Sequence, residues 1–493
     1  MEIKFNRTTL TYMDSVIRQP ALQEQTQQVR IPDSMPDIDV VLSIWGYVSL
    51  RSKEWHADNI QVSGGTTVKV LYLTKEKKPE CIEAWLPFQI GVEIPDTQRD
   101  GTVTVRPFLR NAEAKALSDR KLSIRATVGL SIDARVQCEC QLYTPEIPTE
   151  GVQLLHNAYM LQLPVEVGEK SFAVEEPLKL HSEGTDITIL RQSLEMVATE
   201  CKIIADKLVF RGSAVLDILY MDESGELYRW NRDVSVSQYA QLTGEYDSNA
   251  TADICFAVTE LELERTEDTG YIIKAGILAQ FTICDSKDIS VAEDAYIPNR
   301  MIEITTETLE LPSVLSVNEQ TVQAEADFTM PENRILDVFV LMEELQPEFD
   351  DNTLYIRPAG TFQVLSQDGE GNYYCTSHRW ECTWQLNTSP DIEADISAIF
   401  EGMPEVNGSK ITVPLRLKLI STNGRTNPMI SAIELGDSVA PDPNRPSIIL
   451  QRLGGDTLWQ LAKRTGATVE AIMKANDIQQ EPNSEKLLLI PLN

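Results

Sequence analysis

The sequence predicts a mainly β protein, in which tandem antiparallel β-sandwich-like or barrel-like domains are followed by a small βααβ domain. Three observations lead to this prediction. Apolar and polar residues alternate through much of residues 1–446, as in strands with one buried face. A stretch of sequence recurs at long spacing within that region. After residue 447 the apolar residues change to helical spacing.

The length and charge of the chain restrict its class. At 493 residues it exceeds one ordinary domain, and roughly three or four domains are expected. The 75 acidic and 43 basic residues give a net charge of −32, which repels phosphate backbones and anionic lipids. We therefore expect no nucleic-acid partner. The sequence shows neither an apolar run that could span a membrane nor the apolar core of a secretory signal, so we expect a cytoplasmic protein.

A weak internal repeat organises the first part of the chain. Residues 57–72 align without a gap with residues 205–220, at an offset of 148. A fainter third copy, displaced by a further 146, covers residues 354–365. A period this long indicates tandem domains rather than a solenoid. We expect the copies to fold as separate units that share one topology.

Each copy has the pattern of β-strands and a turn. In the second copy the alternating run is expected to break at Gly212 and then to resume. Asp222 to Gly225 then forms a turn. Asp368 and Gly371 occupy the matching positions of the third copy.

The domain boundaries follow from the repeat, the charge and the prolines. Three prolines fall within residues 439–446, which indicates a stiff linker. After residue 446 acids and bases balance, so the whole net charge lies before the linker. The predicted division is an N-terminal segment, 1–28; β domains at 29–150, 170–300 and 310–436; a proline-rich linker, 437–446; and a C-terminal domain, 447–493.

The C-terminal domain has the pattern β-α-α-β. A short strand opens it, and residues 487–491 form the closing strand. Asp456 or Thr457 caps the first helix, which Gly466 ends. Thr468 caps the second helix.

This pattern resembles the LysM family. Residues 455–459, Gly-Asp-Thr-Leu-Trp, match its opening signature, and Ile490-Pro491 matches its end. In that family, N-acetylated glycans lie in a shallow groove between the loop after the first strand and the loop before the second. The resemblance implies a groove lined by Gly455, Asp456, Thr457, Leu458, Trp459, Asn476, Asp477, Ile478 and Gln479.

The groove departs from the family pattern on one side. Ser484-Glu485 stands where a glycine–glutamine pair is common, and Asp477 and Glu481 add further charge. Neutral sugars gain little from carboxylates that must lose their water, whereas a basic protein surface can pair with them. We therefore predict that this domain binds a protein more strongly than an N-acetylglucosamine-containing glycan. Trp459, expected to be half-exposed, is the candidate anchor.

The repeats resemble the SPOCS domain of clostridial sporulation proteins. Residues 32–38, Pro-Asp-Ser-Met-Pro-Asp-Ile, and later Val70-Leu71-Tyr72 match its opening. SPOCS domains followed by one LysM domain form the layout of a family of spore coat morphogenetic proteins. The resemblance implies a non-enzymatic scaffold on the mother-cell side of the forespore surface, with the spore coat morphogenetic ATPase as its partner.

The sequence shows no catalytic framework. Phosphate-binding loops, nucleophile elbows and His-Glu-x-x-His motifs are absent, and the four histidines are far apart. Cys138 and Cys140 share one face of a strand, but no second pair lies at zinc-site spacing. The eight cysteines are widely spread, which favours free thiols. We expect no enzyme activity, no cofactor and no metal.

Two alternatives from other classes stay open. One is a peptidoglycan-binding protein that acts through its LysM-like domain, and the other is a hydrolase with an unrecognised catalytic domain. A group of ring-bearing residues, Tyr373, Tyr374, His378, Trp380 and Trp384, would suit a platform on which sugars stack. Aromatic residues in strands are more often core residues, and we interpret them so.

Overall fold

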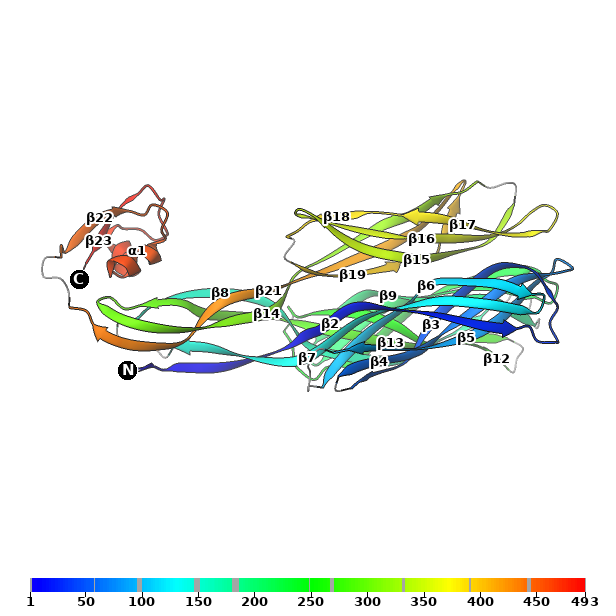
Figure 1. Ribbon diagram of the computed structural model, residues 1–493, viewed down its shortest axis with the longest axis horizontal. Helices are drawn as coiled ribbons and strands as arrows, with labels where there is room; N and C mark the ends of the chain where they lie inside the picture. Colours follow the sequence, from blue (N-terminus) through cyan, green and yellow to red (C-terminus); the bar gives the residue numbers. More distant parts are fainter. Residues whose placement is uncertain are drawn as a thin grey trace.

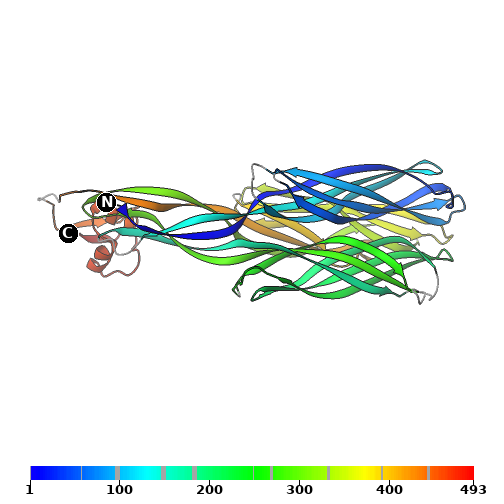
Figure 2. The same ribbon diagram turned by 90° about the horizontal axis from the view of Figure 1, so that it is seen from below.

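The computed structural model describes residues 2–56, 58–94, 100–145, 151–179, 186–247, 249–266, 270–329, 333–389, 392–440 and 445–492. The molecule is elongated (Figure 1, Figure 2). Antiparallel β domains gather at one end, and long strands leave them as a narrow stalk. The C-terminal domain lies at the far end, beside the tip of the stalk. The described chain is mainly β, as predicted.

The first and second β domains each consist of two three-stranded antiparallel sheets. In the first domain the sheets are β2(Phe5–Arg30)-β7(Lys121–Pro145)-β6(Gly101–Ser118) and β3(Ile38–Trp55)-β4(Asn59–Thr74)-β5(Pro79–Glu93). In the second they are β12(Thr251–Arg265)-β13(Tyr271–Tyr296)-β8(Gln153–Leu178) and β11(Leu227–Gln241)-β10(Lys207–Asp222)-β9(Ile187–Ile204).

The third β domain has the same plan with extra short strands. One sheet contains β14(Arg300–Asp327), β21(Lys410–Ser438), β19(Glu393–Phe400) and β20(Glu405–Asn407), with β1(Glu2–Ile3) also paired to β21. The other contains β15(Arg334–Asp350), β16(Thr353–Gln367), β17(Tyr373–Glu381) and β18(Trp384–Asn387). The repeated sequence occupies β4, β10 and β16, which are the central strands of the three corresponding sheets.

The structure places the expected N-terminal segment 1–28 differently. Residues 5–30 form β2, which pairs along its whole length with β7 of the first β domain. Much of β2 is exposed at the edge of its sheet, so its sequence is too polar to resemble a buried strand. The second and third domains likewise begin earlier than predicted, with β8 at Gln153 and β14 at Arg300. Within the expected linker 437–446, residues 441–444 lie outside the described residues.

The central strand of each domain contains a glycine that faces a β-bulge in the neighbouring strand. Gly212 was expected to break its strand, but β10 continues through it and the pairing with β9 shifts register there. Gly64 and Gly360 face similar shifts in β3 and β15. A Cβ atom at Gly64, Gly212 or Gly360 would lie 2.2, 2.6 or 2.0 Å from a neighbouring backbone oxygen. The glycines therefore allow the bulged strand to approach closely.

Replacing Gly360 by alanine is expected to lower the free energy of unfolding by about 2 kcal/mol, because the new Cβ atom overlaps the carbonyl oxygen of Leu341. Gly91 is the matched control, since its Cβ atom would meet nothing within 4 Å. Gly91→Ala should change stability by less than about 0.5 kcal/mol. Equilibrium denaturation of both variants tests this prediction, and equal stability of the two would contradict it.

The turn after each central strand is also shared. In the second domain the N–H of Gly225 donates to the carbonyl of Asp222, and Gly225 has a φ of 86°. Gly371 and Asp368 make the same bond in the third domain, with a φ of 87°. In the first domain Lys77 holds this position, with a φ of 64°. Because glycine adopts this conformation without strain, the signature is clear in two copies and hidden in the first.

Six long strands from all three β domains form the stalk. Strands β2, β7, β8, β13, β14 and β21 contain 25 to 29 residues each. At about 3.3 Å per residue, such strands extend roughly 80–95 Å, which is enough to form a sandwich and continue beyond it. Their outer parts share an apolar core, which consists of Tyr12, Tyr143, Leu161, Leu163, Ile289, Val291, Leu309, Leu311 and Met429.

The β domains also share a core at the wide end of the molecule. Trp45 and Leu71 of the first domain pack with Leu190 and Leu219 of the second and Leu365 of the third. This arrangement differs from the expectation of separate folding units. The domains meet along two apolar cores, so their stabilities are expected to be coupled.

A buried ion cluster joins the second and third domains. Arg191 is only 1% exposed, and its guanidinium donates to both carboxylate oxygens of Asp337, at 2.6 and 2.8 Å. It also donates to Asp217 at 2.5 Å, and Arg229 donates to Asp217 at 2.9 Å. Although burial opposes it, the charge of Arg191 and the bonds from Arg229 lower the pKa of Asp217.

Candidate functional site

The C-terminal domain forms the predicted βααβ unit. Its elements are β22(Ile448–Arg452), α1(Leu458–Thr465), α2(Val469–Ala475) and β23(Leu487–Pro491). Thr457, one of the two predicted caps, accepts from the N–H of Gln460, while the Gln460 side chain accepts from the N–H of Thr457. Gly466 ends α1 with a φ of 68°, and Thr468 caps α2. These cap predictions are confirmed.

The two loops that were expected to line the groove are bridged to each other. The backbone N–H of Leu458, at the start of α1, donates to the Glu481 carboxylate at 2.7 Å. The N–H of Gly454 donates to the carbonyl of Ser484 at 3.0 Å. Glu481 therefore binds an N–H group at the start of α1 that could otherwise donate to a ligand carbonyl. Its carboxylate is then not free to pair with a basic partner, as the sequence had suggested.

The predicted groove residues have different surroundings. Leu458 is buried, whereas Gly455, Thr457, Asp477 and Gln479 are exposed. The remaining residues, Asp456, Trp459, Asn476 and Ile478, are half-buried.

Several of these residues serve the fold. Asp456 forms an ion pair of 2.5 Å with Arg464. The Asn476 side chain donates to the carbonyl of Leu489 at 2.6 Å and accepts from its N–H at 2.8 Å, which ties the second loop to β23. Asp477 has a φ of 50°, a turn conformation that an aspartate tolerates.

Trp459 contacts the tip of the stalk. Its indole N–H donates to Asp294 of β13 at 2.7 Å, and its ring meets Tyr296 edge to face at 4.9 Å. Lys463 donates to Asp294 at 2.6 Å, and the Tyr296 hydroxyl donates to the carbonyl of Ala467 at 2.9 Å. We call this set of four side chains, Asp294, Tyr296, Trp459 and Lys463, the docking contact. Neither of its stalk members, Asp294 and Tyr296, belongs to a motif or pattern that the sequence shows.

The electrostatics of the docking contact depend on Asp294 and Tyr296. Partial burial opposes ionisation of Asp294, but the bonds from Lys463 and Trp459 outweigh it and lower the pKa of the carboxyl. Burial raises the pKa of Tyr296 to about 12. The contact therefore pairs a carboxylate with an ammonium group and keeps the phenol neutral at physiological pH.

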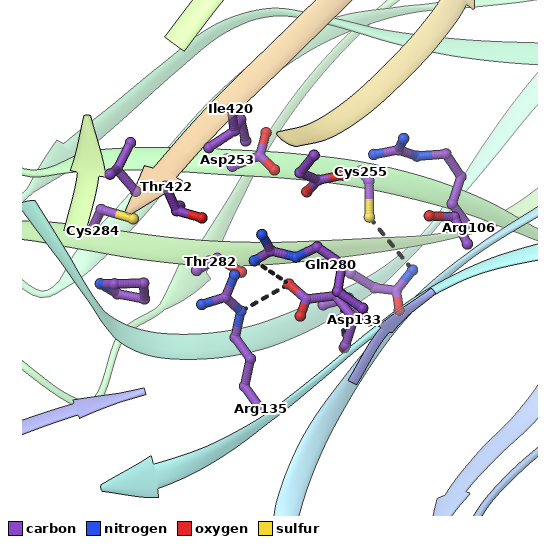
Figure 3. Close-up of a pocket in the computed structure, with 16 residues that line it drawn as sticks. Arg106, Asp133, Arg135, Asp253, Cys255, Gln280, Thr282, Cys284, Ile420 and Thr422 are labelled. Carbon is purple, nitrogen blue, oxygen red and sulfur yellow. Dashed lines mark hydrogen bonds and ion pairs between the residues drawn. The ribbon is translucent and has the colours of Figure 1, made fainter. Parts of the chain in front are cut away.

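A polar cavity lies where the three β domains meet (Figure 3). Its volume is about 60 Å³. The first domain contributes Arg18, Arg106 and Arg135, the second contributes Asp253, and the third contributes Asp395. The cavity therefore joins opposite charges from three domains.

The thiols of this cavity are not activated. Cys255 and Cys284 both line it, and Figure 3 shows Cys255 beside Gln280. Burial raises the pKa of both thiols, that of Cys284 to about 11. A protonated thiol is a poor nucleophile. No histidine lies among the residues that line the cavity.

The other cysteines and the two tryptophans of the third domain pack against cores. Cys138 and Cys140 face the same side of β7, as predicted, and contact the stalk core. Trp380 and Trp384 are 1% and 5% exposed, so the core interpretation holds for them, whereas Tyr374 is 46% exposed. Among the described residues, no group of three or more His, Cys, Asp or Glu side chains could hold a metal ion.

Comparison with protein families identifies two segments. Residues 37–117 match the family described as SipL, SPOCS domain, and residues 455–481 match the LysM domain. The chain contains a SPOCS domain and a LysM domain. The SPOCS match covers β3, β4, β5 and most of β6 of the first β domain. No curated protein and no solved structure matches the chain.

The opening motif of the SPOCS domain has a structural role. Arg120, in the turn between β6 and β7, donates to the carbonyl of Pro32 at 2.7 Å and to the carboxylate of Asp37 at 2.6 Å. It also donates to the carbonyl of Met35 at 3.3 Å. One guanidinium thus fixes the loop that leads from β2 into β3.

The two families fit a non-enzymatic role in sporulation or in peptidoglycan binding. Neither helix of the described chain is long and apolar enough to cross a membrane.

Replacing Asp294 by alanine is expected to loosen the LysM domain from the stalk without unfolding either, because Trp459 and Lys463 lose their shared acceptor. The loss of charge-assisted bonds should weaken docking by about 2 kcal/mol. Hydrogen exchange of peptides from α1 and the end of β13 measures the change. Asp288→Ala, at an exposed position of the same strand, is the control. Unchanged protection in Asp294→Ala would contradict the role of the contact.

The same contact should respond to acid. Since the pKa of Asp294 in the folded protein lies below its ordinary value of 3.8, its contribution is present at neutral pH. That contribution is lost as the pH falls through the lowered pKa. Exchange in α1 should therefore rise in acid in the wild type, after correction for the intrinsic rate, and should change less in Asp294→Ala.

Proposed function

We propose that this protein is a non-enzymatic scaffold of spore coat assembly. It would act in the cytoplasm, on the mother-cell side of the forespore surface, and bind the spore coat morphogenetic ATPase through its LysM domain. The SPOCS and LysM matches support the sporulation role. The elongated shape supports scaffolding, because it separates the LysM domain from the β domains (Figure 1).

One observation supports a protein partner for the LysM domain in particular. Its two-stranded sheet exposes Ile448, Leu450 and Leu487, at 53%, 64% and 54%. Leu450 pairs with Leu489, and Ile448 pairs with Pro491, so these residues form an apolar face, which ends at the pair of Leu487 with Arg452. Apolar clusters on a protein surface are typical of protein contacts.

The groove supports the same choice. The N–H groups of Thr457, Leu458 and Gln460 are all bound to side chains of the chain itself. An acetamido group would have to displace these partners to gain a hydrogen bond. Trp459 is also engaged by Asp294. The glycan-binding alternative rests on the LysM match.

Calorimetry of the full chain with N-acetylglucosamine oligomers separates the two candidates. We expect a dissociation constant weaker than about 1 mM for the wild type. Glu481→Ala frees the N–H of Leu458 and tests whether the carboxylate blocks the groove. Glu485→Ala, which removes an 82% exposed carboxylate from the same loop, is the control. Micromolar sugar binding by the wild type would favour the alternative, a peptidoglycan-binding protein.

A further inference from the structure

A cluster of cations covers one end of the second β domain. Lys202 lies near the end of β9, Lys207 and Arg211 near the start of β10, and Lys170 in β8. Tyr239 of β11 lies among them. We call these five residues the basic patch. It is unusual in a chain whose net charge is −32.

The aromatic ring and the cations of the basic patch contact each other. The Nζ atoms of Lys170 and Lys207 lie 6.0 and 5.6 Å from the centroid of the Tyr239 ring. Tyr239 is nevertheless 57% exposed, and Lys202 and Arg211 are 65% and 66% exposed. The patch is therefore preorganised by cation–π contacts and remains open to solvent.

Few carboxylates neutralise the basic patch. Glu200 forms ion pairs with Lys202 and with Arg211, the latter at 3.3 Å. Asp206 accepts from the side chain of Gln241 at 2.7 Å. Neither acid forms an ion pair with Lys170 or Lys207 among the described contacts. The two lysines beside Tyr239 therefore stay available for an ion pair with an external group.

The fold itself does not require the basic patch. In the second domain Val209 of β10 pairs with Lys202 on one side and Tyr239 on the other. The matching residue of the first domain, Gln61, pairs with Glu54 and Gly91. In the third domain the matching residue, Tyr355, pairs with Glu348 and Gln385.

The first residue of the central strand also differs among the three domains. Lys207 corresponds to Asn59 and Thr353, the first residues of β4 and β16. Corresponding sheets therefore form with a glutamate where the second domain has Lys202, and with a neutral residue where it has Lys207. The fold therefore does not account for the cations of the second domain.

We propose that the basic patch binds an acidic segment of a partner protein. The outer face of sheet β9-β10-β11, together with Lys170 from the edge strand β8 of the neighbouring sheet, is suited to an extended peptide. Its carboxylates would pair with Lys170 and Lys207 while an apolar group packs on Tyr239. A broad anionic membrane or a nucleic acid fits less well, because four cations must act against the repulsion of the whole chain. This interface is separate from the LysM domain and goes beyond the function proposed above.

The test is fluorescence anisotropy with a labelled oligoglutamate peptide that contains one leucine, added to the full chain at low salt. We expect saturable binding that the double variant Lys170→Glu/Lys207→Glu weakens by at least about tenfold. Lys78→Glu/Lys121→Glu makes the same charge change at two exposed lysines of the first domain and should bind like the wild type. Lys170→Arg/Lys207→Arg should retain binding, and Tyr239→Ala should weaken it by about threefold to fivefold.

Three outcomes would overturn the proposal. The first is no binding of the peptide by the wild type. The second is equal loss in the two charge-reversal variants, which would indicate a general effect of net charge. The third is tighter binding of phosphatidylserine vesicles or single-stranded DNA than of the peptide, in a manner that depends on Lys170 and Lys207. Circular dichroism of each variant checks that the substitutions leave the fold intact.

Discussion

Asp337→Ala is expected to lower the free energy of unfolding by about 4 kcal/mol. The substitution removes the carboxylate that accepts two hydrogen bonds from Arg191. Arg191 is 1% exposed and keeps its charge, because its carboxylate partners raise the pKa of the guanidinium despite burial. A buried charge without its main partner is among the costliest defects in a protein. Since Asp337 and Arg191 belong to different β domains, both domains should lose stability together.

Equilibrium denaturation followed by circular dichroism measures this effect. Glu348→Ala is the matched control, because Glu348 lies in the same strand and its ion pair with Arg357 is exposed. Exposed pairs contribute less than about 1 kcal/mol. If the free energies of unfolding of Asp337→Ala and Glu348→Ala differed by less than about 1 kcal/mol, the interface between the two domains would not depend on this ion cluster.

Leu163→Ala is expected to cost about 3 kcal/mol, because it opens a space in the stalk core. Leu163 is fully buried and packs in the stalk core with residues from the long strands of the other two domains. Met160 is the control, since it lies three residues earlier in β8 and is 78% exposed. Met160→Ala should be close to neutral.

The same denaturation experiment distinguishes a shared stalk from three independent pairs of strands, β2 with β7, β8 with β13, and β14 with β21. With a shared core, Leu163→Ala shifts the main unfolding transition of the molecule. The contrary result is a separate early transition of small amplitude with the main transition unchanged. It would mean that the stalk unfolds alone and that its strands do not stabilise the β domains.

The C-terminal domain could be predicted in detail because its signals are local. Thr457, Gly466 and Thr468 each specify a helix end through contacts within a few residues. The stalk could not be predicted in the same way. Strands of 25 residues or more are far longer than usual, so the predicted β domains leave out most of β2 and the first parts of β8 and β14.

The candidate site was predictable only in part. The groove loops lie where the LysM resemblance placed them, but the hydrogen bonds of Glu481 and Trp459 depend on the folded chain. Asp294 is 165 residues from Trp459 in sequence, and no periodicity or motif connects them. The expected break at Gly212 is absent because the glycine faces a bulge in the neighbouring strand and its own strand continues.

The proposed function requires the LysM domain to bind the coat morphogenetic ATPase through its apolar sheet face. Retention of the purified ATPase on the immobilised full chain tests it most directly. We expect retention by the wild type and by the control Met160→Glu, loss of at least about tenfold in Leu450→Glu, and no release by excess N-acetylglucosamine oligomers. Equal retention by Leu450→Glu, or release of the ATPase by the sugar, would contradict this account.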